Sequence, residues 1–152
     1  MHAIRPADKA DLPEVLRLYA QPKMDNGSIL SILEAEAIFE RMQRYPNYRL
    51  YIAADNNGHI VGTFALLIMD NLGHLGSPSG IVEDVVVDPA WQGHGIGKAM
   101  MQFARRICKE AGCYKMMLSS NLKRTEAHAF YDSLGFEKHG FSFLVGYSRG
   151  KP

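Results

Sequence analysis

Apolar side chains along the chain follow two different spacings, and the change from one to the other predicts where helices and strands lie. Spacing of three and four residues predicts helices. The first follows a cap at Asp8 or Asp11, with Glu14 placed to complete a capping box after Asp11. The others are expected from Ser31 to a stop before Pro46, at about 96–111, and near 125–134.

Short apolar or alternating runs predict the strands, expected at 2–5, 48–55, 60–69, 81–87 and 115–119, with two more within 136–147. The strands at 48–55 and 60–69 are joined by Asn56-Asn57-Gly58, which favours a tight hairpin because these residue types tolerate positive φ. The run at 81–87 is typical of a central strand covered on both faces. This order of elements predicts one domain over residues 1–152, of the α/β (α+β) class, with one mixed sheet and helices on both faces.

Composition excludes several classes of protein. The 152 residues are 47% apolar and 22% charged, which is typical of a globular domain, and the formal charge of +1 favours neither nucleic acid nor an anionic membrane as a partner. No apolar run reaches the length of a signal peptide core or a membrane span, so a soluble, cytoplasmic protein is expected. Cys108 and Cys113 are too few for a disulfide framework or a four-ligand zinc site, and no metal is expected.

A glycine-rich turn at 92–98 separates the predicted central strand from the amphipathic helix after it. Glycines let the backbone approach a ligand closely, and free N–H groups at a helix start bind phosphate with the help of the helix dipole. The turn does not match the dinucleotide-binding fingerprint, because Lys98 occupies the position that needs a glycine. It does not match the phosphate loop of nucleoside triphosphatases either, because that loop needs glycine at the position of Gln92 and Ser or Thr at that of Ala99. On glycine spacing alone, a tight connection that binds nothing is the alternative.

The turn also carries a family resemblance. Gln92-x-x-Gly95-x-Gly97 resembles the Arg/Gln-x-x-Gly-x-Gly/Ala signature of the GNAT superfamily of N-acetyltransferases. The similarity extends upstream through Val85-Val86-Val87-Asp88-Pro89 and downstream to Asn121 and the segment 129–136. It implies a mostly antiparallel sheet of the GNAT type, with central strands splayed around acetyl-coenzyme A as the co-substrate.

The resemblance implies which residues bind that coenzyme. The backbone of Val85, Val86 and Val87 is expected to pair with the pantetheine arm, while the strand at 115–119 diverges from it. The pyrophosphate is expected in the turn formed by Gln92, Gly93, His94, Gly95, Ile96, Gly97 and Lys98. Asn121 is expected to bond the pantetheine, and Phe130 to pack on it. For His94 and for His128, a solvent-facing side chain is an equal alternative.

Two adjacent carboxylates, Glu83 and Asp84, interrupt the apolar central strand. Burial of an unpaired carboxylate is costly, so their presence needs a reason, and strand alternation predicts that they point to opposite faces. A loop cap or an ion pair is the structural alternative. Similarity to polyamine and glucosamine-phosphate acetyltransferases implies that Glu83 is the general base and that Asp84 holds the amine. Asp84 is the alternative base.

Tyr131 is the candidate general acid. A phenol with a pKa near 10 keeps its proton at neutral pH and can donate it to a departing thiolate. Tyr131 matches the position of the general-acid tyrosine in the GNAT superfamily. The alternative is a core tyrosine with a satisfied hydroxyl.

The acceptor is the least predictable part. Segment 119–131 looks like bacterial aminoalkylphosphonate N-acetyltransferases, whereas 83–87 and 112–115 look like glucosamine-6-phosphate N-acetyltransferases, and both stretches lie chiefly in the coenzyme half. In this superfamily two loops usually build the acceptor pocket, which makes Asp25 and His74 candidate substrate-binding residues. A small primary amine is expected, with an anionic group as one option.

The alternatives are a protein or peptide N-acetyltransferase and a non-enzymatic coenzyme A-binding module. A homodimer is expected, because dimers are frequent among similar proteins.

Overall fold

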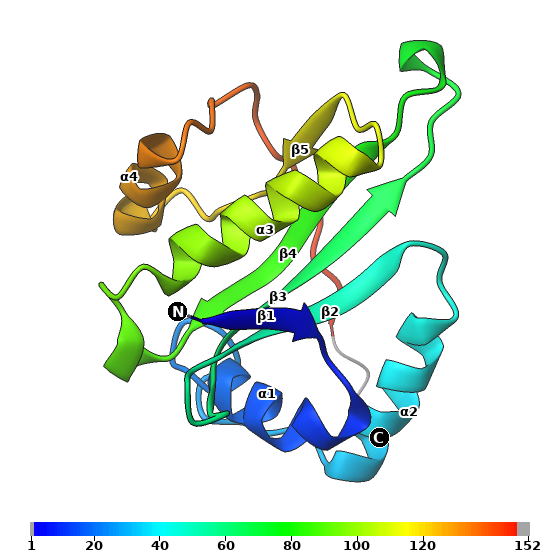
Figure 1. Ribbon diagram of the computed structural model, residues 1–152. Coiled ribbons are helices and arrows are strands. Elements are labelled where there is room, and N and C mark those ends of the chain that lie inside the picture. Colours follow the sequence, from blue (N-terminus) through cyan, green and yellow to red (C-terminus); the bar gives the residue numbers. More distant parts are fainter. Residues whose placement is uncertain (1, 149–152) are drawn as a thin grey trace. The chain divides into compact units, whose positions relative to one another are not determined.

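The computed structural model describes residues 2–148, and the chain divides into two compact units between Leu118 and Ser119. The first unit contains a five-stranded sheet with its helices, and the second contains one helix and an extended segment (Figure 1). Across the described residues, no helix combines the length and the apolar character needed to cross a bilayer.

The sheet of the first unit has the order β1-β2-β3-β4-β5. Strands β1 to β4 pair antiparallel, and β5 runs parallel to β4. The strands are β1 (Ala3–Pro6), β2 (Tyr48–Ala54), β3 (Ile60–Met69), β4 (Ser79–Val87) and β5 (Lys115–Met117). The predicted hairpin joins β2 to β3, where the Asp55 carboxylate accepts hydrogen bonds from the N–H groups of Asn57 and His59, and Gly58 has a φ of 83°.

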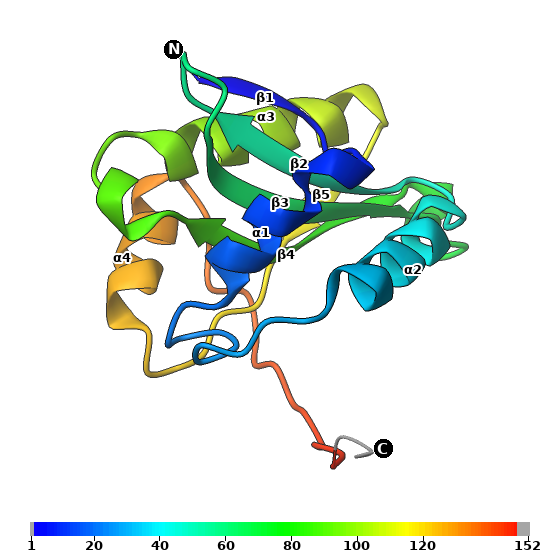
Figure 2. The ribbon, with the colours of Figure 1, turned by 90° about the horizontal axis from the view of Figure 1, so that it is seen from below.

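Helices cover both faces of this sheet, as the sequence predicts. Figure 2 shows α1 (Leu12–Tyr19) and α2 (Ile32–Gln43) on one side and α3 (Ile96–Glu110) on the other. The apolar face of α1 is buried against the sheet. It forms one hydrophobic core with residues of α2, β2, β3 and β4. The mixed, mostly antiparallel sheet with helices on both faces is therefore confirmed.

The caps of the first two helices differ in how well they were predicted. Ser31 accepts a hydrogen bond from the Glu34 N–H, so α2 begins where the capping pattern places it. The predicted capping box of Asp11 and Glu14 at the start of α1 is wrong. Asp8 caps the short 3-10 turn η1 (Lys9–Asp11), and the Asp11 carboxylate bonds back to the Asp8 N–H, which leaves no side-chain cap for α1. Asp11 is also held by both terminal nitrogens of Arg5, at 2.7 and 2.9 Å.

The start of α3 lies directly on β3 because Gly62 has no side chain. A Cβ at Gly62 would stand 3.0 Å from both Ile96 Cγ2 and Met100 Sδ. Gly62 is also the register partner of Val87, the last residue of β4. One glycine thus sets the first turn of α3 close to the end of the central strand.

The second unit contains α4 (Thr125–Ser133), which ends near Gly135, a glycine with a φ of 87°, as predicted. The two strands expected within 136–147 are absent from the described residues. A strand needs a neighbour to accept and donate its backbone hydrogen bonds, and here the segment has none. Its large apolar side chains, at Phe141, Phe143, Leu144, Val145 and Tyr147, are exposed.

Candidate active site

The central strand β4 has a free edge toward its C-terminal end. β5 pairs only with Ser79, Gly80 and Ile81, so within the first unit the residues from Val82 to Val87 have no strand on that side. The expected divergence of the two central strands is present. An extended ligand with amide groups can therefore lie along the segment that contains Val85, Val86 and Val87, where it would meet backbone N–H and C=O groups.

The turn after β4 has the backbone expected of an anion-binding loop. Gly93 and Gly95 both have a φ of 80°, and Gly95 is the N-cap of α3 without any side-chain cap. The N–H groups of Ile96, Gly97 and Lys98 have no acceptor within the helix, because they lie in its first turn. A Cβ at Gly93 or Gly95 would meet no atom within 4 Å, so conformation and not packing requires glycine there.

Side chains of the turn and of α1 hold this junction in place. The His94 ring lies 5.5 Å from that of Trp91, which in turn makes an edge contact with His2, while Gln92 is exposed. From α1, Arg17 donates to the Asp88 carboxylate at 3.0 Å and to the Ile60 carbonyl. These contacts connect the turn and the end of β4 to α1 and to the N-terminal strand.

A β-bulge at Asp84 changes the prediction for the two carboxylates. Glu83 is paired with Ala65 and Val86 with Thr63, so Asp84 and Val85 together stand opposite one residue of β3. Asp84 has a φ of 52°, in the left-handed region. The expectation that alternation separates Glu83 and Asp84 onto opposite faces is wrong, because a bulge adds a residue and re-aims the side chains around it.

Both carboxylates belong to the face covered by α1 and α2. Ala65, the register partner of Glu83, is part of the core on that face. Asp84 lines a cavity of about 230 Å³ under the same two helices. Its lining is mostly apolar and consists of Leu12, Val15, Leu16, Tyr19, Asp25, Leu30, Ala35, Ile38, Phe39, Met42, Tyr48, Leu50, Ala65 and Asp84.

The cavity brings together two of the predicted substrate residues and omits the third. Asp25 and Asp84 both line it. His74 does not line it. His74 lies in the loop between β3 and β4, and its ring is stacked on that of Tyr114 with the ring centroids 4.1 Å apart. Tyr19 and Tyr48 also line the cavity and were not predicted as site residues, because each reads as part of an apolar pattern in its element.

Electrostatics in and beside the cavity oppose further negative charge. Desolvation raises the pKa of Asp84, and the charge of Asp25 raises it further. Desolvation and the charge of Asp84 raise the pKa of Glu83. The pKa of the Tyr19 and Tyr48 phenols is raised by burial and by Asp84, and at Tyr48 also by Glu83. A cation placed among these groups would relieve the repulsion, which is what an ammonium group provides.

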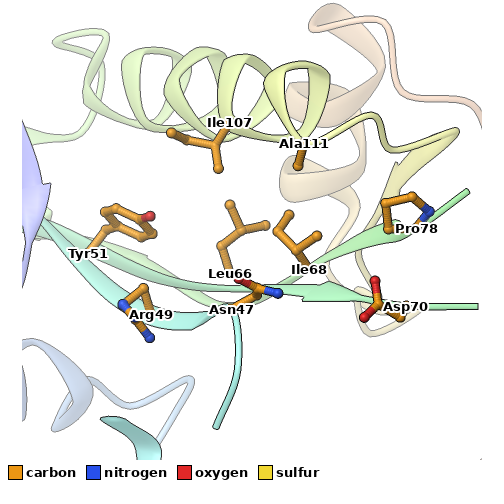
Figure 3. Close-up of a pocket in the computed structure, with 9 residues that line it drawn as sticks. All are labelled: Asn47, Arg49, Tyr51, Leu66, Ile68, Asp70, Pro78, Ile107 and Ala111. Atoms are coloured by element: carbon orange, nitrogen blue, oxygen red, sulfur yellow. The ribbon is translucent and has the colours of Figure 1, made fainter. Parts of the chain in front are cut away.

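A second cavity, of about 290 Å³, lies between α3 and the sheet (Figure 3). Leu66, Ile107 and Ala111 line it, with Arg49 and Asp70 among its polar residues. Leu66 and Ala65 are consecutive strand residues, so their side chains point to opposite faces. This cavity is larger, but it lies on the other side of the sheet from Asp84 and contains neither Glu83 nor Asp84.

The remaining predicted residues lie in the second unit. Asn121 forms a turn in which its side-chain oxygen accepts from the Lys123 N–H, and its carbonyl accepts from His128 Nε2 at 2.8 Å. The ring of Tyr131 lies 5.2 Å from that of Phe130 and 5.5 Å from that of Phe136. Burial raises the pKa of the Tyr131 phenol, which keeps it protonated at neutral pH.

Sequence reasoning missed two polar residues that fix the site from α1 and the loop after it. Gln21 donates from Nε2 to the Val87 carbonyl at 3.2 Å, and Arg17 ties α1 to Asp88. Arg17 looks like an ordinary surface position of an amphipathic helix and Gln21 like an ordinary loop residue, and no local signal marks either one. Among the described residues, no group of three or more His, Cys, Asp or Glu side chains is arranged to hold a metal ion.

Comparisons with known proteins agree with this geometry. The Acetyltransferase (GNAT) family matches residues 12–136. A glucosamine 6-phosphate N-acetyltransferase of Trypanosoma brucei brucei is 32% identical over 136 residues, which cover 90% of this chain and 89% of the relative. An aminoalkylphosphonate N-acetyltransferase of Salmonella typhimurium is 33% identical over 97 residues, covering 64% and 60% of the two chains. The crystal structure of a Trypanosoma brucei acetyltransferase superposes with a TM-score of 0.83 at 29% identity, covering 97% of this chain and all of the other.

Proposed function

The chain belongs to the GNAT family of acetyltransferases, and we propose that it transfers the acetyl group of acetyl-coenzyme A to the primary amine of a small molecule. The observation that carries the proposal is the set of ionisable groups around the cavity under α1 and α2. The cavity is lined by Asp25, Asp84, Tyr19 and Tyr48. Glu83 lies close to them, since its charge adds to the desolvation that raises the pKa of Tyr48, and the charge of Asp84 adds to the desolvation that raises the pKa of Glu83. A cavity of about 230 Å³ suits a small acceptor better than a peptide.

The coenzyme would supply an activated acetyl thioester. The first-turn N–H groups of α3 and the glycines before them would hold its pyrophosphate, and the free edge of β4 would pair with its pantetheine arm. Gln92 carries no charge, so the anion would be held by backbone donors and the helix dipole. His94 and Lys98 are exposed at the same turn and would lie at the margin of the bound coenzyme.

Acetyl transfer requires an amine with a free lone pair, which an ammonium lacks. We assign the proton acceptor to Glu83, whose pKa is raised by desolvation and by Asp84, because a raised pKa makes a carboxylate a stronger base. Asp84 and Asp25 would hold the amine through their charges. The neutral amine attacks the thioester carbonyl carbon, the C–N bond forms, and the C–S bond breaks.

The departing thiolate needs a proton. We assign the donor to Tyr131, whose phenol stays protonated at neutral pH. Asn121 and Phe130, from the same unit, would contact the pantetheine. An ammonium that becomes an amide loses two protons. Glu83 would accept the first before attack, and the nitrogen would lose the second as the C–S bond breaks, replacing the proton that Tyr131 gives to the thiolate. The net products are the N-acetylated amine, the free thiol and one proton, which passes from Glu83 to solvent.

Release of free thiol from acetyl-coenzyme A tests the proposed function. The assay compares a panel of small primary amines, a panel of peptides and a reaction without acceptor. Release that depends on small amines is expected. Release only with peptides would favour a peptide N-acetyltransferase, and coenzyme binding without release under any condition would favour a binding module.

A further inference from the structure

The cavity under α1 and α2 has an apolar body and a polar end. Its apolar walls come from α1, α2, β2 and β3, with Leu12, Leu50 and Phe39 buried in the core. Among the described residues, Asp84 and Asp25 are its only charged lining residues, and the phenol of Tyr19 lies within the electrostatic reach of Asp84, Asp25 and Tyr48. A ligand that fits this distribution has an amine at one end and hydrocarbon at the other.

Among the described residues that line the cavity, none carries a positive charge that would pair with an anion. No Lys, Arg or His is among the residues that line the cavity. Nearby segments do carry cations, at Lys23, Arg41 and Arg44, but none of these lines it. A phosphate or carboxylate placed in the cavity would meet two carboxylates in a site where desolvation and the charge of Asp25 already raise the pKa of Asp84, and it would find no cationic partner among the described lining residues.

The outer side of the cavity continues the apolar character. Leu30 and Ile38 line the cavity and are also 40% and 37% exposed. Ile29 and Leu33, beside them in the sequence, are 62% and 80% exposed. A sugar phosphate gains nothing from such a surface, whereas an alkyl or aryl group gains about 25 cal/mol for each Å² of apolar area removed from water.

Size sets the scale of the acceptor. An apolar cavity of about 150 Å³ in a protein core accommodates benzene. The cavity here measures about 230 Å³, which leaves room for an aromatic ring or a branched alkyl group together with a short aminoalkyl arm.

We infer that the acceptor is a primary amine on an apolar body, an aralkyl or alkyl amine without a phosphate or carboxylate group. This inference rests on the proposed function and narrows it. It separates the chain from its relatives, whose names specify a phosphorylated amino sugar and an aminoalkylphosphonate. In this chain, the charged side chains among the described lining residues of the cavity are both carboxylates.

Acceptor selectivity provides the test. We would measure kcat/KM for 2-phenylethylamine, hexylamine, glucosamine, glucosamine 6-phosphate and aminomethylphosphonate. The inference predicts that kcat/KM for each of the two apolar amines is about 100-fold higher than kcat/KM for glucosamine 6-phosphate. Burial of roughly 100 Å² of apolar surface accounts for a factor of that size. It also predicts that kcat/KM for glucosamine 6-phosphate is no higher than kcat/KM for glucosamine. Preference for glucosamine 6-phosphate over both apolar amines would overturn the inference while leaving the proposed acetyl transfer intact.

Two variants locate the selectivity in the cavity. Ile38→Lys places an ammonium in the lining, whereas Ala37→Lys adds the same charge at the neighbouring exposed position, which does not line the cavity. Ile38→Lys is expected to lower kcat/KM for 2-phenylethylamine by about 10-fold or more, since it removes apolar lining and repels the substrate ammonium. Ala37→Lys is expected to leave it unchanged. Equal effects of the two variants would place the acceptor outside the cavity.

Binding tests the same inference even without turnover. 2-Phenylethylamine at millimolar concentration should raise the Tm of the parent and not of Ile38→Lys, whereas glucosamine 6-phosphate should not raise the Tm of the parent. If no amine supports thiol release but the apolar amine raises Tm in this pattern, the proposed catalysis fails and the ligand class stands. A Tm shift from glucosamine 6-phosphate alone would refute the ligand class.

Discussion

Asp25 and Asp84 come from a loop and from a central strand, yet they line one cavity, and the charge of Asp25 raises the pKa of Asp84. The backbone of Asp84 is itself in the left-handed region, with a φ of 52°. A carboxylate held in an uncommon conformation next to another carboxylate is unfavourable for the fold. Such strain is found at sites where charge and geometry serve a ligand.

The first prediction is that Asp84→Asn stabilises the fold and impairs the reaction. Asparagine tolerates positive φ and has no charge to repel Asp25. The raised pKa of Asp84 means that its ionisation destabilises the folded state, and this effect appears as pH rises above the unfolded value of 3.8. Thermal melts should show a Tm about 2 °C higher for Asp84→Asn at pH 7. The shift is small because Asp84, although partly desolvated at the cavity, keeps more than a third of its surface exposed and solvent screens its charge.

The advantage of Asp84→Asn should disappear below about pH 3, where aspartate is largely protonated in both the folded and the unfolded state. Asp84→Ala serves as the matched control, because it also removes the charge but tolerates positive φ poorly. A Tm that falls for Asp84→Asn at pH 7 would show that Asp84 contributes to stability, and its assignment to the amine would lose its support.

The second prediction concerns the turn before α3. Gly95→Asp places a carboxylate where the pyrophosphate is proposed, whereas Gly95→Asn has nearly the same shape and the same tolerance of positive φ. Acetyl-coenzyme A should raise the Tm of the parent and, less strongly, of Gly95→Asn. It should not raise the Tm of Gly95→Asp. Equal shifts in the two variants would remove the pyrophosphate from this turn.

The third prediction concerns the base. Glu83→Gln should keep coenzyme binding and lower turnover by about 10²-fold or more below neutral pH. Part of the activity should return at high pH, because a larger fraction of the free amine is then already neutral. Rates measured from pH 6 to 10 decide this. If Glu83→Gln matches the parent throughout, Glu83 is structural and Asp84 becomes the candidate base.

The fourth prediction concerns the proton donor. Tyr131→Phe keeps the ring that lies beside Phe130 and Phe136 and removes only the hydroxyl, so stability should change little. Turnover and kcat/KM should fall together by about 10- to 10⁴-fold, since the lost interaction acts in the transition state. An acetyl donor with a more acidic thiol should shrink the deficit. A lower Tm with normal turnover for both donors would identify a core tyrosine.

Local sequence features predict the parts of this fold that depend on neighbouring residues. The Asn56-Asn57-Gly58 hairpin, the Ser31 cap and the start of α3 after Gly95 all follow from turn and cap chemistry within a few residues. The family resemblance adds the divergence of β4 and β5, which no local pattern contains.

The missed features depend on contacts distant in sequence. The alternating apolar pattern of residues 141–147 is strand-like, but a strand exists only where a neighbour completes its hydrogen bonds. The bulge at Asp84 arises from the register of β4 against β3, and the tolerance of aspartate for positive φ is too weak a signal to locate it. Tyr19 and Tyr48 count as apolar in any pattern, so their shared cavity emerges only when α1 packs on the sheet.

The central claim is that an amine bound near Glu83 attacks acetyl-coenzyme A directly. Its most direct test is the stoichiometry of the reaction, followed by mass spectrometry of both amine and protein together with free thiol. We predict one N-acetylated amine for each thiol released, no thiol without amine, and no acetyl group on the protein at any time. Thiol release without an amine, accompanied by an acetylated protein side chain, would contradict direct attack.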